Sequence, residues 1–235
     1  MKNPFLLILV LLITNSCQSQ TARDYLYSGN EKCNLQDYSG AIADYTKVIE
    51  LEPDNANAYY NRGNAKGDIH DLRGAISDFN KAIEINPKLK EAFHSRGRIK
   101  KDLNDYRGAI SDFTIAISFD SKYVDAYFSR GIAKESIQNF SGAILDYNKA
   151  IENNPQFVKA YNNRGNAKCN LHDYKGAISD YTIALGIDPK FAEAYFNRGI
   201  AKIILGQKEN GCLDLSKAGE LGLLKAYESI QNYCN

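Results

Sequence analysis

The sequence predicts an all-α protein, a solenoid of six helix-turn-helix units followed by a short capping helix. The first observation behind this prediction is a repeat of 34 residues, and the second is a pair of amphipathic patterns with helical spacing inside each period. The repeat is plainest in the dipeptide Arg-Gly, which occurs at Arg62-Gly63, Arg96-Gly97, Arg130-Gly131, Arg164-Gly165 and Arg198-Gly199.

The composition excludes several classes of protein. The chain of 235 residues has 29 Lys and Arg against 28 Asp and Glu, so its net charge is +1 and it lacks the basic surplus of a nucleic-acid-binding protein. Its hydrophobic content of 44% and its 5 prolines are those of a folded chain rather than a disordered one. We therefore expect a folded protein with no nucleic-acid partner.

Residues 1–16 have the pattern of a secretory signal peptide. Lys2 supplies a positive charge, the apolar run Phe5–Ile13 follows, and small or polar residues lead to Cys17. An apolar run of this length extends about 14 Å as a helix, roughly half of a bilayer core, so it does not predict a membrane-spanning anchor.

Cys17, directly after this segment, resembles the lipidated cysteine of the bacterial lipobox. Thr14 stands where that motif usually has Leu, and ordinary cleavage after Ser16 would instead leave Cys17 as a free thiol. The resemblance implies a lipoprotein of the bacterial cell envelope, held in the membrane by its N-terminal lipid, with residues 17–21 as the attachment cysteine and a short tether. Gln18 is not the Asp that marks retention in the inner membrane, which favours the outer membrane over the inner membrane or free secretion.

Each repeat unit is expected to contain two helices. In the second unit the spacing of apolar residues predicts a first helix over about 57–70, a turn at Asp71 and a second helix over about 72–85. Asn86-Pro87 ends the second helix, because Pro lacks an N–H and disfavours helical angles in the residue before it. The units are 22–55, 56–89, 90–123, 124–157, 158–191 and 192–225, and residues 226–235 form the predicted cap helix.

One first-helix position is glycine in all six units. A glycine inside a helix costs up to about 1 kcal/mol relative to alanine, so its recurrence indicates a packing requirement. We expect the two helices of each unit to approach each other closely there. The glycines are Gly29, Gly63, Gly97, Gly131, Gly165 and Gly199.

The repeat resembles the tetratricopeptide repeat, TPR, whose period is also 34 residues. In the second unit the resemblance rests on Tyr59, Gly63, Ala75, Phe79, Ala82 and Pro87, and the pattern recurs along residues 22–225. Arg62 and Lys66 depart from the commonest form of the repeat, which has Leu and Tyr at these positions. The resemblance implies a right-handed superhelix whose first helices line a concave groove.

A column of aspartates runs through the second helices, and we call it the Asp column. Lysine occupies one first-helix position in every unit, and arginine occupies another in five units, with Ser28 in the first. A buried charge persists only when it is paired, so each Asp is expected to pair with Arg or Lys, either of its own unit or of the next. Ser28 favours pairing of each Asp with the next unit, because an Arg in the first unit would have no preceding Asp to reach. The members are Asp44, Asp78, Asp112, Asp146, Asp180 and Asp214.

No pattern of catalytic or ligand-binding residues stands out. The 3 histidines have no zinc-like spacing with cysteines, and the chain has neither a phosphate-binding loop nor a Gly-x-Ser-x-Gly nucleophile motif. Six copies of Asp at one spacing describe a structural repeat rather than an active site. The sequence therefore predicts no enzyme activity, no cofactor and no metal site.

Four cysteines follow Cys17. Cys33 and Cys169 share one column four units apart and are interpreted as small surface or groove residues. Cys212 is expected to point inward, and Cys234 ends the predicted cap helix, which should run back along the last unit. The two sulfurs could form a disulfide, which a secreted context permits, or remain two buried thiols.

The groove-facing residues follow from the TPR resemblance by column. Asparagine offers a donor and an acceptor to the backbone of an extended peptide, and Phe128 and Phe196 could form apolar pockets. The alternative is a solvated wall with incidental asparagines. No three units reproduce the basic and Asn constellation with which some TPR proteins capture a C-terminal carboxylate. The candidates are Tyr60, Asn61, Asn64, His94, Arg98, Phe128, Asn162, Asn163, Asn166, Phe196 and Asn197.

These features together predict a non-catalytic envelope lipoprotein that holds a protein or peptide in its groove and is a monomer outside its complex. In layout the chain resembles outer-membrane lipoproteins made of tandem TPRs, which serve as assembly factors or pilotins. A self-associating structural protein and an enzyme are the less favoured alternatives. The identity of the partner does not follow from the sequence.

Overall fold

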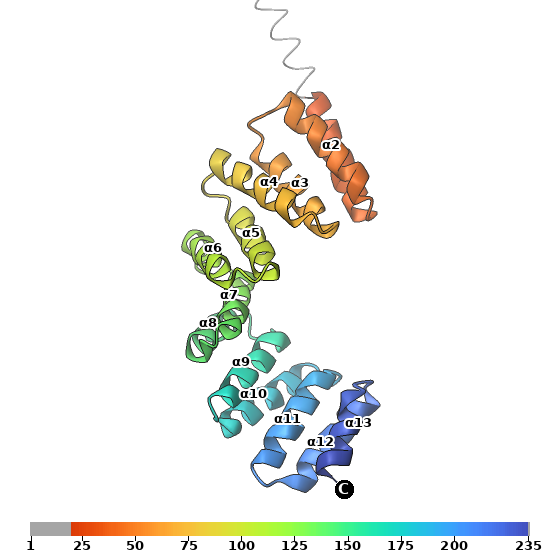
Figure 1. Ribbon diagram of the computed structural model, residues 1–235, viewed down its shortest axis with the longest axis vertical. Helices are drawn as coiled ribbons and strands as arrows, with labels where there is room; N and C mark the ends of the chain where they lie inside the picture. The colour runs from red at the N-terminus through yellow and green to blue at the C-terminus, as the bar shows by residue number, and fades with distance from the viewer. Residues whose placement is uncertain (1–19, 235) are drawn as a thin grey trace, which may run out of the picture. The chain divides into compact units, whose positions relative to one another are not determined.

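The computed structural model describes residues 20–234, and all the regular secondary structure in this range is helical (Figure 1). The predictions for the signal peptide and for Cys17 lie outside the described residues. Gln20 and Thr21, assigned above to the tether, belong to the first helix. The helices are residues 20–34, α2 (Tyr38–Leu51), α3 (Ala56–Asp68), α4 (Leu72–Ile85), α5 (Lys90–Asp102), α6 (Tyr106–Phe119), α7 (Val124–Ser136), α8 (Phe140–Asn153), α9 (Val158–Asn170), α10 (Tyr174–Ile187), α11 (Ala192–Ile204), α12 (Lys208–Glu220) and α13 (Lys225–Tyr233).

The chain divides into two compact units, one ending at Asp105 and one beginning at Tyr106. In the first, α2 packs against α3, α3 against α4 and α4 against α5. In the second, each helix from α6 to α13 likewise packs against the next. The contact is more extensive between the two helices of one repeat, such as α7 and α8, than between successive repeats. This succession of packed helix pairs confirms a solenoid of helical repeats. Within residues 20–234, no helix is long and apolar enough to cross a membrane.

The turn inside each helix pair has a fixed chemistry. Asp71 caps α4, because its Oδ1 accepts a hydrogen bond of 3.0 Å from the Gly74 N–H, as side chains at this position commonly do. The preceding His70 adopts a left-handed backbone with φ of 62°. The same pair of features recurs at Gln138-Asn139 and His172-Asp173, so the turn is built the same way in both units.

The recurring glycines make room for a buried aromatic ring at Gly29, Gly63, Gly131 and Gly165, whereas Gly199 faces Leu215 and the backbone of Gly211. A Cβ atom added to Gly63 would lie 2.8 Å from Cε1 of Phe79, and one added to Gly131 would lie 2.5 Å from Cε1 of Tyr147. Both rings are buried, and each comes from the second helix of the same pair. The close approach expected from the glycine column is thus an approach of the first helix to this ring.

Replacing Gly131 by alanine is expected to lower the free energy of unfolding by about 1 to 3 kcal/mol, because the methyl group forces the Tyr147 ring out of place. Urea unfolding followed by circular dichroism measures the change. Gly186 near the end of α10 is the matched control, since a Cβ there meets nothing within 4 Å. Alanine at Gly186 should leave stability unchanged or raise it by up to about 1 kcal/mol. Equal effects of the two substitutions would contradict this explanation.

The Asp column forms ion pairs inside single helix pairs, so the arrangement favoured by Ser28 was wrong. Arg62 donates from Nε and Nη2 to the two oxygens of Asp78 at 2.9 and 2.8 Å, and Lys66 Nζ lies 2.8 Å from the same carboxylate. In the first pair, Ser28 Oγ replaces the arginine and donates to Asp44 at 2.6 Å. The same pattern joins Arg130 and Lys134 to Asp146, Arg164 and Lys168 to Asp180, and Arg198 and Lys202 to Asp214.

The arginines also link successive pairs. Arg62 Nη1 donates to Thr46 Oγ1 of the preceding second helix at 3.1 Å, and its guanidinium carbon lies 5.5 Å from the centre of the Tyr59 ring. Arg198 repeats both contacts with Thr182 and Tyr195. Each of these arginines therefore joins the Asp of its own repeat to the preceding repeat. The spacing of charges within one repeat does not predict this second contact.

The last helix covers the end of the second unit. α13 packs against α12, and Ala226 is buried in the contact. Cys212 of α12 and Cys234 after α13 form a disulfide with an S–S distance of 1.99 Å and a Cα–Cα distance of 5.8 Å. Of the two states left open by the sequence, the structure contains the bonded one.

Candidate functional site

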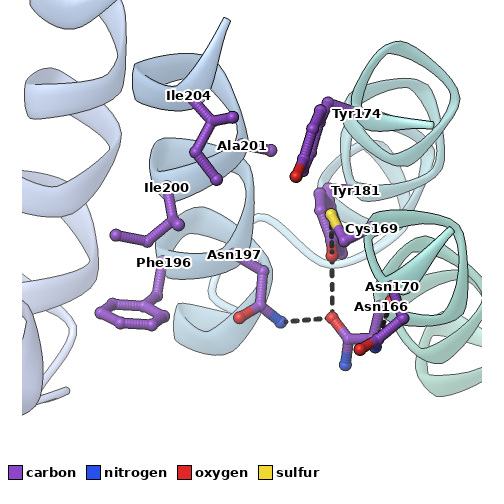
Figure 2. Close-up of a pocket in the computed structure, with 10 residues that line it drawn as sticks. All are labelled: Asn166, Cys169, Asn170, Tyr174, Tyr181, Phe196, Asn197, Ile200, Ala201 and Ile204. Atoms are coloured by element: carbon purple, nitrogen blue, oxygen red, sulfur yellow. Dashed lines mark hydrogen bonds between the residues drawn. The ribbon is translucent and has the colours of Figure 1, made fainter. Parts of the chain in front are cut away.

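A hollow of about 400 Å³ opens between the first helices of the last two repeats, and we call it the C-terminal hollow (Figure 2). α9 and α11 form its two walls, and α10 contributes two tyrosines behind them. Its lining residues are Asn166, Cys169, Asn170, Tyr174, Tyr181, Phe196, Asn197, Ile200, Ala201 and Ile204.

Hydrogen-bonded amides connect the two walls. Asn197 Nδ2 of α11 donates to Oδ1 of Asn162 and to Oδ1 of Asn166 on α9, both at 3.0 Å. Tyr181 donates its hydroxyl to the same Asn166 oxygen at 2.8 Å, as Figure 2 shows. Asn162 Nδ2 donates in turn to Asn163 Oδ1 at 3.3 Å. We call Asn162, Asn163, Asn166 and Asn197 the amide ladder.

Two polar groups of the ladder stay available. Asn197 uses its amide nitrogen within the ladder, and Asn166 uses its amide oxygen. Within the described residues, the Asn197 oxygen and the Asn166 nitrogen form no hydrogen bond with the protein. An acceptor on α11 and a donor on α9 can bond the N–H and C=O groups of an extended peptide backbone.

The α11 side of the hollow is apolar. Phe196, Ile200 and Ile204 lie one turn apart along the helix, and Ile204 remains 54% exposed (Figure 2). Lys225 of α13 stands over the Phe196 ring, with Nζ 4.2 Å from its centre, which is the geometry of a cation–π contact. A bound chain would therefore meet an apolar wall beside neutral amides.

The first unit contains an equivalent hollow of about 280 Å³, the N-terminal hollow. Tyr45 donates to Asn30 Oδ1 at 2.8 Å and Asn61 Nδ2 donates to the same oxygen at 3.2 Å, which repeats the floor of the C-terminal hollow. Asn64 and Asp68 replace the isoleucines, so its wall is polar. It is lined by Asn30, Cys33, Asn34, Tyr45, Asn61, Asn64, Ala65 and Asp68.

The structure distributes the predicted groove residues unevenly. Asn166, Phe196 and Asn197 line the C-terminal hollow, and Asn61 and Asn64 line the N-terminal one. The half-buried Asn163 lies in the amide ladder. On α5, His94 is half-buried and Arg98 is exposed, and neither lines a hollow described above.

Three predicted groove residues serve packing instead. Asn162 is only 6% exposed, and both ends of its amide are used inside the ladder, which leaves little of it to meet a partner. Phe128 packs against Tyr147 and Phe157 with ring centroids 5.8 and 4.7 Å apart. Tyr60 similarly lies 6.0 Å from the Phe79 ring. Phe128 and Tyr60 thus pack against an aromatic ring of the second helix of their own pair, whereas Asn162 is held between first helices.

The column of Cys33 and Cys169 lines the two hollows, and sequence reasoning missed its contact with the buried tyrosines. Cys33 and Cys169 each contact the hydroxyl of the tyrosine beneath, with Sγ–O distances of 3.4 and 3.5 Å to Tyr45 and Tyr181. Burial raises the pKa of the Cys169 thiol. The signal was present, because the two cysteines and both tyrosines recur in register with the 34-residue period.

Glu135 occupies the same column in the fourth repeat. Tyr147 donates its hydroxyl to Glu135 Oε2 at 2.5 Å, so a carboxylate replaces the thiol found in the other two repeats. Burial raises the pKa of Glu135, and the Tyr147 hydrogen bond offsets part of that rise. Burial also raises the pKa of Tyr147, and the nearby Glu135 charge adds to it.

Replacing Glu135 by glutamine should stabilise the protein increasingly as pH rises. A raised folded-state pKa means that the folded protein binds more protons than the unfolded chain above the ordinary carboxyl value of 4.5. The wild type therefore loses stability across this window as pH rises, and the glutamine variant does not. Urea unfolding of both proteins from about pH 4 to about pH 8 gives the difference at each pH.

Glu152→Gln serves as the matched control, because Glu152 is exposed and pairs with Lys149 at the surface. Its difference from the wild type should not grow with pH. A Glu135→Gln difference that stays flat, or that shrinks with rising pH, would contradict the assignment.

Comparison with family models decides the family. Models described as TPR repeat and tetratricopeptide repeat match residues 29–68, 56–89, 94–158 and 146–179, which together span more than half of the chain. The chain belongs to the tetratricopeptide repeat family. The C-terminal hollow thus lies between the first helices of neighbouring TPR units, the surface that the family resemblance assigned to the groove.

Several solved TPR-like structures are similar to this TPR protein. A MamA protein is 27% identical with a TM-score of 0.66, and the match covers 74% of this chain and 96% of MamA. YrrB, described as a TPR protein with an unusual peptide-binding site, is 22% identical over 80% of this chain and 97% of its own, with a TM-score of 0.68. PilF of Pseudomonas aeruginosa is 14% identical over 92% and 98%, with a TM-score of 0.78. No curated protein sequence matches the chain.

Proposed function

We propose that this TPR protein is a non-catalytic interaction scaffold that binds a protein or peptide segment on its first-helix surface. The observation that carries the proposal is the C-terminal hollow, where a free amide acceptor and donor lie beside an apolar wall. The peptide-binding site named for YrrB supports the same use of the fold. The Asp column is committed to ion pairs, which favours a structural role over a catalytic one.

We further propose that the scaffold is an envelope lipoprotein attached through Cys17 and working as a monomer outside its complex. The support is the sequence of residues 1–17, with its charged start, short apolar run and following cysteine. The disulfide between Cys212 and Cys234 fits an exported protein, because such bonds persist in oxidising compartments.

Site-specific photocrosslinking in the native cells tests the scaffold directly. A photoreactive amino acid at Ile200 in the hollow should yield a defined crosslinked partner. The matched control is the exposed Ser179 on α10, outside the residues that line the hollow. The same partners from both positions, or none from Ile200, would contradict binding at the hollow.

A further inference from the structure

Glu135 differs from the carboxylates of the Asp column in having no cation beside it. Asp146 and Asp180, on the neighbouring second helices, are each held by an arginine and a lysine of their own repeat. Within the described residues, the half-buried Glu135 accepts a hydrogen bond from Tyr147 and forms no ion pair. A half-buried carboxylate without a counter-charge is costly to keep, so its presence indicates a partner that the chain itself does not supply.

Glu135 lies one repeat before the C-terminal hollow, in the same column as Cys169 of its lining. Asn163 of the amide ladder forms a hydrogen bond with the same Tyr147 hydroxyl that donates to Glu135. Asn162 then connects Asn163 to Asn197 in the hollow. Burial is the main cause of the raised pKa of Tyr181, and the Glu135 charge is among the lesser ones. When ionised, Glu135 therefore adds a negative charge that is felt at Tyr181, a residue that lines the hollow.

The opposite side of the hollow carries a positive charge. Lys225 stands over the Phe196 ring, while the amides between Phe196 and Glu135 are neutral. A segment that runs along the first helices from α11 past α9 to α7 would thus meet the Lys225 cation, the apolar wall of α11 and the Glu135 carboxylate in turn. A second cation is favoured near Glu135 rather than near Lys225, because close opposite charges attract and like charges repel.

We propose that the segment bound in the C-terminal hollow carries an apolar side chain, packed against Phe196 and Ile200, and a lysine or arginine that pairs with Glu135. This inference rests on the proposed scaffold function and names the chemistry of its partner. The backbone of the segment bonds to the free groups of Asn166 and Asn197. The N-terminal hollow, with Asn64 and Asp68 in place of the isoleucines, does not provide the same apolar wall.

Selection from a phage-displayed library of random peptides tests this chemistry without assuming a partner. The wild-type chain from residue 18 onward should enrich peptides with Lys or Arg at a fixed spacing from a large apolar residue. Glu135→Gln should lose the enrichment in Lys and Arg but keep the enrichment in the apolar residue. Ile200→Ser should lose the enrichment in the apolar residue but keep that in Lys and Arg. Synthetic peptides from the wild-type selection should bind Glu135→Gln about tenfold more weakly, as expected when a charged hydrogen-bonded contact is lost.

Glu152→Gln is the control and should select the same peptides as the wild type, since that carboxylate pairs with Lys149 on α8. Equal enrichment of Lys and Arg by wild type and Glu135→Gln would overturn the proposal, as would a preference for acidic or neutral peptides or a failure to enrich any peptide. A partner crosslinked at Ile200 despite such a result would leave the scaffold function standing and reject only the cationic partner.

Discussion

Replacing Asp180 by asparagine is expected to lower the free energy of unfolding by about 3 kcal/mol, the largest effect of any single change considered. Asp180 is 2% exposed. Its carboxylate accepts a hydrogen bond of 2.9 Å from Arg164 Nε and forms an ion pair with Lys168 Nζ at 2.8 Å. The substitution keeps the shape but leaves two largely buried cations without a counter-charge. Removing one member of a buried pair is costly for that reason.

The loss should extend across the repeat boundary. Arg164 also donates to Asn148 of the preceding repeat at 2.7 Å, and its guanidinium lies 5.3 Å from the centre of the Tyr161 ring. Once released from Asp180, the guanidinium no longer holds these contacts in place. Urea unfolding of wild type and variant measures the effect.

Two comparisons separate this mechanism from a general loss of charge. Arg130→Met leaves Asp146 with Lys134 and should cost less than Asp180→Asn. Glu152→Gln breaks only an exposed pair and should leave stability unchanged within error. If Asp180→Asn were as harmless as Glu152→Gln, the Asp column would not hold the helix pairs together.

Removing the disulfide is expected to cost the C-terminal repeat about 3 kcal/mol in a Cys212→Ser/Cys234→Ser variant. The two cysteines are 22 residues apart, so the bond closes a loop through α12 and α13 and restricts the unfolded chain. Without it α13 depends on its packing against α12 and on the contact of Lys225 with Phe196, which is then less firmly held. Thermal unfolding with and without a thiol reductant measures the loss.

The control pair for this experiment is Cys33→Ser/Cys169→Ser. Both of these cysteines are free, so the variant should retain its response to the reductant. The Cys212→Ser/Cys234→Ser variant should not respond. Identical melting of the wild type in reducing and oxidising buffer would show that the bond does not stabilise the last repeat.

Much of the fold follows from the repeat itself. The period and the apolar spacing placed the second helix of the second repeat over about 72–85, and the structure has α4 at Leu72–Ile85. The same spacing overextended the first helix, which ends at Asp68, because the left-handed His70 and the Asp71 cap begin the turn earlier than the apolar pattern indicates. Periodicity locates helices well because it reports burial directly.

The candidate site was less predictable, because it depends on how side chains lean within a column. Asn162 and Asn166 are equally polar in sequence, yet the first is buried in the amide ladder and the second lines the hollow. The pairing of each Asp within its own repeat depends on the approach of two helices, which spacing along one chain does not specify. Glu135 escaped notice because its importance comes from Tyr147 beneath it rather than from any motif.

The central claim is that a peptide binds in the C-terminal hollow, and the side-chain amide resonances of the asparagines test it most directly. In an NMR titration of the isotope-labelled protein with a library-selected peptide, the NH₂ signals of Asn166 and Asn197 should shift. Those of Asn80 on α4 should stay in place, since Asn80 lies in the first compact unit outside the hollow. Shifts at Asn166 and Asn197 in the wild type, weakened in Glu135→Gln, are the predicted result. Binding that leaves both signals unmoved would contradict the account.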